Sequence, residues 1–172
     1  YILKFEIVPV SMKNVLARNT RDLEMQWFGK IRQQEKGRDF ENRYSGLFYK
    51  HLKDDVENLS ESKSERKRIE TSLKWVAFKD QFFASALIAD NSFDISVLSS
   101  KMLSSEEYLK NYNAEIYVTP VMQDNGMLHV GFEYFLGPLQ YSMLRSYDDG
   151  IKDANKELDL DKLVPLGWTL FR

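Results

Sequence analysis

Alternation of apolar and polar residues is the strongest pattern in this chain, and it predicts β-strands that each bury one face. The pattern runs through residues 1–7, 23–32, 93–97, 115–119 and 128–134. Between the last two segments lies Gln123-Asp124-Asn125-Gly126. Asn and Gly tolerate positive φ angles, so this tetrapeptide predicts a tight hairpin turn. The chain is therefore expected to be mainly β.

Residues 73–89 follow a different pattern, because their apolar residues leave little room for a polar face. Such a run predicts a pair of strands buried on both faces, although a buried helix has a similar composition. Enrichment in β-branched and aromatic residues favours strands. We expect the aromatic residues of this run to belong to the core, and these are Trp75, Phe78, Phe82 and Phe83.

Two charged segments lack strand periodicity. Residues 33–43 are expected to form a loop or a short helix, because charged side chains surround Phe40. Residues 58–68 are poor in apolar side chains and are expected to form an exposed connection.

From Gly137-Pro138 onwards the pattern becomes helical, since Pro suits the first turn of a helix. Four apolar residues recur at a spacing of four, which predicts an amphipathic helix; they are Leu139, Met143, Tyr147 and Ile151. Gly150 is expected to end or bend this helix, and Asp161 to cap a final short helix that reaches Val164.

Composition narrows the possible functions. The 172 residues include 24 basic and 26 acidic side chains, and this balance argues against an electrostatic nucleic-acid binder. The chain has no cysteine, which excludes disulfides, thiol catalysis and thiolate metal sites. No apolar run approaches the roughly 20 residues that a membrane helix needs. The opening Tyr1 reads as the middle of a strand, so we expect a fragment of a longer protein.

No catalytic, cofactor-binding or metal-ligating residues are predicted. The two histidines, His51 and His129, have no partner at metal-ligand spacing, and the glycines form no phosphate-binding motif. Adjacent acidic pairs such as Asp148-Asp149 are expected to lie in loops and caps.

Aromatic residues near the end of the chain have two interpretations. Trp168 and Phe171 follow a break at Pro165 and Gly167, together with Leu166. They could pack as an ordinary C-terminal segment. Alternatively, they could mark a membrane–water interface, where the amphipathic ring of Trp prefers to lie.

Three stretches together resemble one family. They are residues 31–37 (IRQQEKG), residues 75–83 (WVAFKDQFF), and residues 137–141 (GPLQY) followed by 163–168 (LVPLGW). In this order and separation, the stretches are similar to the large periplasmic domain of the YidC/Oxa/Alb family of bacterial inner-membrane insertases, in its Bacteroidetes branch. Two departures are a longer 150–161 stretch and Thr169 after the Gly-Trp pair.

The resemblance implies a twisted antiparallel β-supersandwich, similar to galactose mutarotase, with C-terminal helices. Residues 1–136 would be the C-terminal portion of that sandwich, its first strands lying upstream. Residues 137–172 would be a helical segment that leads to the next transmembrane helix.

For function, the resemblance implies an accessory domain that faces the periplasm and has no cofactor. The implied partners are the Sec translocon with its auxiliary subunits, nascent membrane proteins, and the membrane through transmembrane segments outside this chain. Five residues would form a membrane interface or hinge: Pro165, Leu166, Gly167, Trp168 and Phe171. Four would pack the helices or contact a partner: Leu139, Met143, Tyr147 and Ile151.

Two other classes of function stay open. A carbohydrate-processing or mutarotase-like sandwich enzyme with a two-histidine site would need His51 and His129 in one pocket. A free peptide-binding chaperone module would need an exposed apolar groove or an unpaired sheet edge.

Overall fold

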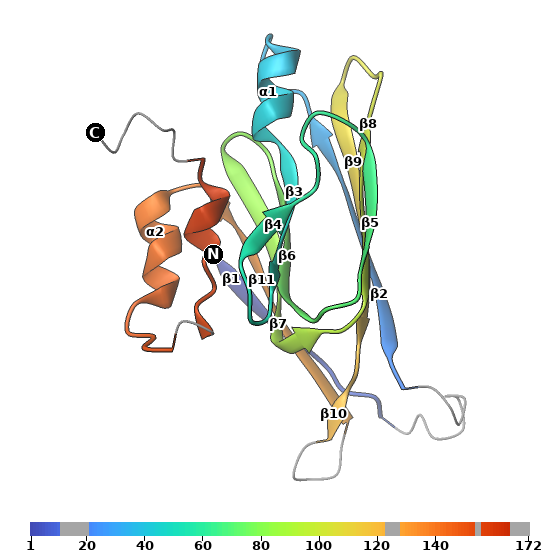
Figure 1. Ribbon diagram of the computed structural model, residues 1–172, viewed down its shortest axis with the longest axis vertical. Coiled ribbons are helices and arrows are strands. Elements are labelled where there is room, and N and C mark those ends of the chain that lie inside the picture. Colours follow the sequence, from blue (N-terminus) through green and yellow to red (C-terminus); the bar gives the residue numbers. More distant parts are fainter. Residues whose placement is uncertain (11–20, 123–127, 154–155, 166–172) are drawn as a thin grey trace.

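Two antiparallel β-sheets face each other in the computed structural model, which describes residues 1–10, 21–122, 128–153 and 156–165 (Figure 1). The larger sheet has the order β1 (Ile2–Ile7), β11 (Leu128–Pro138), β7 (Phe83–Phe93), β6 (Leu73–Lys79), β3 (Gly46–His51), β4 (Val56–Asn58), and β10 (Val121–Met122) also pairs with β11. The smaller sheet has the order β2 (Leu23–Arg32), β9 (Tyr108–Val118), β8 (Ser96–Met102), β5 (Glu65–Ile69). The prediction of a mainly β, antiparallel sandwich is confirmed.

The first hydrophobic core lies between the two sheets. It combines Val76, Phe78 and Leu87 of the larger sheet with Tyr112 and Ile116 of the smaller one. The two layers meet closely where Trp27 of β2 stacks on Phe78 of β6, with ring centroids 3.9 Å apart. Gly29 lies beside the same ring, and a Cβ atom there would come within 3.2 Å of Phe78 Cδ2.

The run over residues 73–89 forms the β6–β7 hairpin, as predicted. Its strands are apolar on both faces because the larger sheet is covered twice. The inner residues of β6 and β7 face the smaller sheet. The outer residues, such as Trp75, Ala86 and Ile88, form a second core with the helical segment that follows β11. Figure 1 shows this segment, in orange and red, on the side of the larger sheet away from the smaller one.

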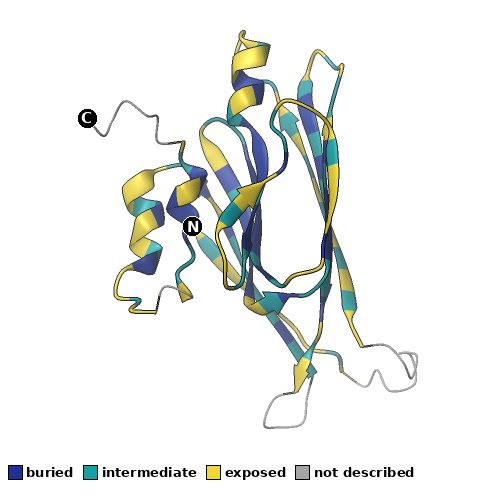
Figure 2. Cartoon of the chain, viewed as in Figure 1, coloured by how far each residue is buried: buried dark blue, intermediate teal, exposed yellow. Residues whose placement is uncertain are grey.

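The hairpin tip corrects one prediction about the core. Phe82 and Phe83 were expected to be buried, but their exposed fractions are 52% and 53%. Phe82 lies in the turn between the two strands, and Phe83 is the first residue of β7. Figure 2 shows the burial along the chain, with most of the buried segments on the strands of the two sheets. Hydrophobic composition identifies an apolar stretch of sequence, but it does not show where the chain turns within that stretch.

The sandwich is closed on one side and open on the other. On the closed side the chain passes from β4 to β5, and Leu59 is buried on the way. On the open side lie β1 and β2, and each pairs with only one other strand in the described residues. The alternation in β1 predicted a buried face, but Leu3 and Phe5 are 60% and 44% exposed, because the smaller sheet does not extend over them.

The two charged segments have different secondary structures. Residues 38–44 form the helix α1 (Arg38–Tyr44), as one of the two expected alternatives. The predicted exposed connection at 58–68 is partly wrong, because its second half is strand β5. Strand β3 had no predicted counterpart.

The predicted turn at residues 123–126 lies outside the described residues. The strands on either side of it, β10 and β11, pair in an antiparallel register that joins Met122 to Leu128. In the described residues, no helix has the length and hydropathy that a membrane crossing requires.

Candidate functional site on the outer face of the larger sheet

The helical segment, which we define as the described residues between 139 and 165, packs on the outer face of the larger sheet. It contains helix α2 (Tyr141–Arg145) and the 3-10 turns η2 (Ser146–Asp148) and η4 (Leu160–Leu163). Leu144, Leu160 and Leu163 are completely buried in the second core. Apolar burial therefore supplies the main stabilisation of the docked segment.

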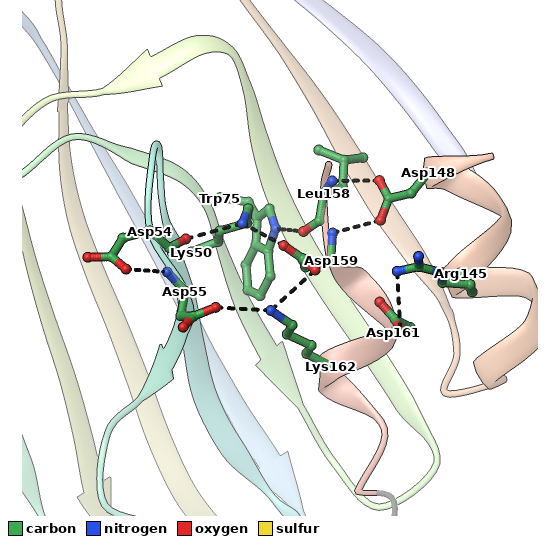
Figure 3. Close-up of polar contacts among 10 residues, drawn as sticks. All are labelled: Lys50, Asp54, Asp55, Trp75, Arg145, Asp148, Leu158, Asp159, Asp161 and Lys162. Atoms are coloured by element: carbon green, nitrogen blue, oxygen red, sulfur yellow. Dashed lines mark hydrogen bonds and ion pairs between the residues drawn. The ribbon is translucent and has the colours of Figure 1, made fainter. Parts of the chain in front are cut away.

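Side chains of the sheet also bind backbone oxygens of the helical segment. Trp75 in β6 donates its indole Nε1–H to the carbonyl oxygen of Leu158 at 2.6 Å (Figure 3). Lys79, at the end of the same strand, donates from Nζ to the carbonyl oxygen of Leu163 at 3.0 Å. Because both donors stand on one rigid strand, they fix the register in which the segment lies across the sheet.

A buried ion pair forms the third polar attachment. Nζ of Lys50 in β3 lies 2.6 Å from Oδ2 of Asp159, and both side chains are nearly buried. Lys162 approaches the other carboxylate oxygen at 3.3 Å and also reaches Asp55 in the turn before β4 (Figure 3). Burial raises the pKa of Asp159, but hydrogen bonds and charge from Lys50 and Lys162 outweigh it, so the pKa lies below its ordinary value.

Asp148, at the end of η2, is hydrogen-bonded to the stretch of the helical segment that leads into η4. Its Oδ1 accepts the backbone N–H of Leu158 at 2.6 Å, and its Oδ2 accepts that of Asp159 at 2.9 Å. Asp159 itself has a φ of 53°, a left-handed conformation that Asp tolerates better than most residues. This conformation ends the extended stretch and starts η4.

Three carboxylates in this region lie close enough together to resemble a metal site. Oxygen atoms of Asp148, Glu157 and Asp159 lie within 4.8 Å of one another. However, both oxygens of Asp148 accept backbone N–H groups, and both oxygens of Asp159 face lysines. Two of the three carboxylates are therefore already bonded within the chain, and they join parts of the helical segment to each other and to the sheet.

The predicted helix residues mostly meet at this docking face. Leu139, Met143 and Tyr147 are half-buried and pack on the second core. They do not share one helix, because β11 runs on to Pro138, α2 begins at Tyr141, and Gly150 with a φ of 83° reverses the chain. Ile151 follows that reversal and lies outside this cluster.

Most of the residues predicted to form a membrane interface or hinge lie outside the described residues. Pro165 is exposed. Leu166, Gly167, Trp168 and Phe171 lie outside the described residues, so their assignment to a membrane interface or hinge stays a prediction. Sequence reasoning missed Lys50, Lys79 and Leu144, and only the absence of a polar face in residues 73–89 hinted that a covering segment exists.

The two histidines do not form a common site. His51 in β3 contacts Thr71 and approaches Glu57, whereas His129 in β11 lies near Glu6. Strands β3 and β11 are separated by β6 and β7, so three strand spacings, roughly 14 Å, lie between them. The two-histidine version of a sandwich enzyme is therefore wrong.

Fold and site together define a β-sandwich domain whose C-terminal helical segment is clasped to the outer face of the larger sheet. Comparison with known proteins identifies the family: the YidC periplasmic domain matches residues 9–171. The chain belongs to this family.

Similar proteins come mostly from Bacteroidetes. The membrane protein insertase YidC of Parabacteroides distasonis is 42% identical over 172 residues, and that of Porphyromonas gingivalis (strain ATCC 33277) is 39% identical over 174 residues. The same insertase of Bacteroides fragilis is 36% identical over 173 residues. Each alignment covers 100% of this chain but 27% of the relative, so the chain spans about a quarter of those proteins.

Proposed function

We propose that this chain is a periplasmic accessory domain of an inner-membrane protein insertase and is not itself an enzyme. In this role it assists the insertion and folding of membrane proteins through protein–protein contacts with the Sec translocon and its auxiliary subunits, and it positions the membrane part. The support is membership of the YidC periplasmic domain family and similarity to complete insertases.

The positioning role is supported by the way in which the helical segment is attached to the larger sheet, and we call this attachment the clasp. Trp75, Lys79 and Lys50 attach residues 158–163 to strands of one sheet at three points. A segment held at one point could swing, but three points on a rigid sheet fix both its position and its direction. The chain that follows Pro165 therefore leaves the sandwich at a defined place.

The test loosens the clasp in a full-length insertase. We expect Asp159→Ala to reduce insertion of a small membrane protein in cells, because the change leaves Lys50 buried without its carboxylate. Asp149→Ala is the matched control, since Asp149 is exposed in the same segment. Protease sensitivity of the helical segment must rise in the first variant only. Normal insertion at normal abundance, with the segment demonstrably loosened, contradicts the positioning role.

The membrane-interface role of Trp168 and Phe171 extends the same proposal. Their replacement by Ala in the same cellular assay is expected to lower insertion as well, since interfacial aromatics anchor a segment at headgroup level. Unchanged insertion by this double variant removes the interface assignment and leaves the clasp unaffected.

A second candidate function, binding of extended apolar peptides, is favoured by the open side of the sandwich. Among the described residues, strand β2 has no second neighbour there, and a groove of about 220 Å³ beside it is lined by Trp27, Phe83 and Leu136 among others. An extended peptide could add to the edge of β2 through main-chain hydrogen bonds. Peptide arrays without any affinity for extended apolar sequences exclude this candidate.

A further inference from the structure

Two of the stretches that carry the family resemblance meet at a pocket outside the clasp. Residues 31–37 supply Gln34 and Glu35, and residues 75–83 supply the β6–β7 turn with Gln81, Phe82 and Phe83. The pocket has a volume of about 470 Å³. Two segments more than 40 residues apart in the chain thus form one concave surface.

Both walls of the pocket are held rigidly by buried or capped carboxylates. Glu41 of α1 is 1% exposed, and its two oxygens accept the backbone N–H groups of Gln34 and Glu35 at 2.8 and 3.1 Å. On the opposite wall, Oδ1 of Asp80 accepts the N–H groups of Phe82 and Phe83 at 2.8 and 2.6 Å. The pocket is therefore preformed, which lowers the entropic cost of binding.

These contacts occupy the backbone donors of the pocket, so the side-chain amides of Gln34 and Gln81 are its remaining uncharged donors, beside the carboxylate acceptors. The carboxylate of Glu35 forms no ion pair with any described residue, and Oε1 of Gln81 is buried without a hydrogen-bond partner there. Half-exposed rings of Phe82 and Phe83 complete the lining.

We propose that this pocket binds an arginine side chain presented by a partner protein. The planar guanidinium can stack on an aromatic face while it donates hydrogen bonds to a carboxylate and an amide oxygen. Its aliphatic stem suits the Phe82 ring. An anionic group would instead be repelled by the unpaired carboxylate of Glu35 and would lose its hydration without a compensating positive charge.

The neighbouring surface indicates what should flank the arginine. Phe83 and Asp80 also line the apolar groove beside β2, so that groove continues directly from the pocket. Phe28 and Leu136 are strongly exposed along it. The expected partner is therefore a segment with an arginine next to apolar residues. The pocket adjoins Lys79 of the clasp, but none of its lining residues belongs to the helical segment, so the inference does not depend on the proposed positioning role.

The test titrates the full chain, labelled with nitrogen-15, with the peptide acetyl-Leu-Arg-Leu-amide and with the same peptide containing citrulline. Citrulline has the shape of arginine without its charge. We expect amide shifts at Gln34, Glu35, Gln81 and Phe82 with the arginine peptide, and an affinity at least about tenfold lower for citrulline, as for loss of one charge-assisted hydrogen bond. Equal affinities overturn the proposal.

Two variants sharpen the result. Glu35→Gln should weaken arginine binding about tenfold, whereas Glu106→Gln, an exposed acid on another loop, should leave it unchanged. Vesicles of phosphatidylcholine and phosphatidylglycerol test the competing occupant. If the chain binds vesicles, loses that binding in Phe82→Ala, and ignores the arginine peptide, the surface is a membrane contact and the proposal is wrong.

Discussion

At the scale of single residues, buried lysines are the least expected feature of the molecule. Lys110 in β9 is completely buried, and no carboxylate of the described residues forms an ion pair with it. Instead, Nζ donates to the carbonyl oxygens of Asn42, Ser45 and Glu61 at 2.7, 2.6 and 2.8 Å. Burial lowers its pKa to about 8, so the ammonium group still carries its three protons at neutral pH. One side chain thus joins the end of α1, the start of β3 and the loop after β4.

Replacement of this lysine should reveal that connection. We expect Lys110→Met to lower the free energy of unfolding by about 3 kcal/mol, because three carbonyl oxygens lose their buried donor. Urea denaturation measures the change. Lys101→Met is the control, since Lys101 is exposed on the neighbouring strand β8 and should change stability by less than ~0.5 kcal/mol. Equal stability of both variants would contradict a stabilising role for the three hydrogen bonds of Lys110.

A second residue-scale prediction concerns pH. Hydrogen bonds from Tyr49, and then from Lys67, lower the pKa of Glu57 to about 2. A carboxyl with a lowered folded pKa stabilises the fold above its ordinary pKa of 4.5 and loses that effect as pH falls towards 2. Wild type should therefore be more stable than Glu57→Gln at pH 7.

The size and trend of this difference provide the test. The Glu57 side chain is about half exposed, so the advantage should be small. Chemical denaturation at pH 7, 4 and 3 should show it shrinking steadily with acidity. A difference that grows as pH falls would mean that Glu57 does not make its contacts as a carboxylate.

At the scale of elements, the helical segment explains why the β6–β7 hairpin has apolar residues on both of its faces. Sequence patterns predicted the strands of that hairpin and the apolar residues Leu139, Met143 and Tyr147, because burial leaves a periodic trace. They also predicted a final short helix, which is η4, but its N-cap is Asp159 and not Asp161. They did not predict that the first helix is reduced to α2 followed by η2. This arrangement depends on Gly150 and on Asp159 in a left-handed conformation, and on lysines that look in sequence like ordinary polar strand positions.

Hydrogen exchange can test how the segment is attached. Trp75→Phe keeps an aromatic ring but removes the indole donor from Leu158, which should cost about 1–2 kcal/mol. Amide exchange at Leu158 and Asp159 should accelerate, since local opening becomes easier. Trp27→Phe, on the inner face of β2, should leave those two amides unchanged. The attachment is not local if both variants accelerate them equally.

At the scale of the whole molecule, the two sheets differ in width, and the difference defines the open side. Alternation in β1 predicted a strand correctly, but it could not show that the smaller sheet ends at β2 and leaves Leu3 and Phe5 uncovered. The arginine pocket was equally hidden, because its walls are close only after the β6–β7 turn folds against the loop before α1. Pairing in space, unlike periodicity, leaves no trace in one sequence.

The clasp has a mechanical consequence. Its attachment points follow one another along the chain, with Lys79 at Leu163, Lys50 at Asp159 and Trp75 at Leu158. Tension applied beyond Pro165 would load the Lys79 contact first and the Trp75 contact last. These contacts would then break one after another at low force, while the strands beneath the segment stay paired. A pull on the chain beyond Pro165 would lengthen this connection before it disturbed the sandwich.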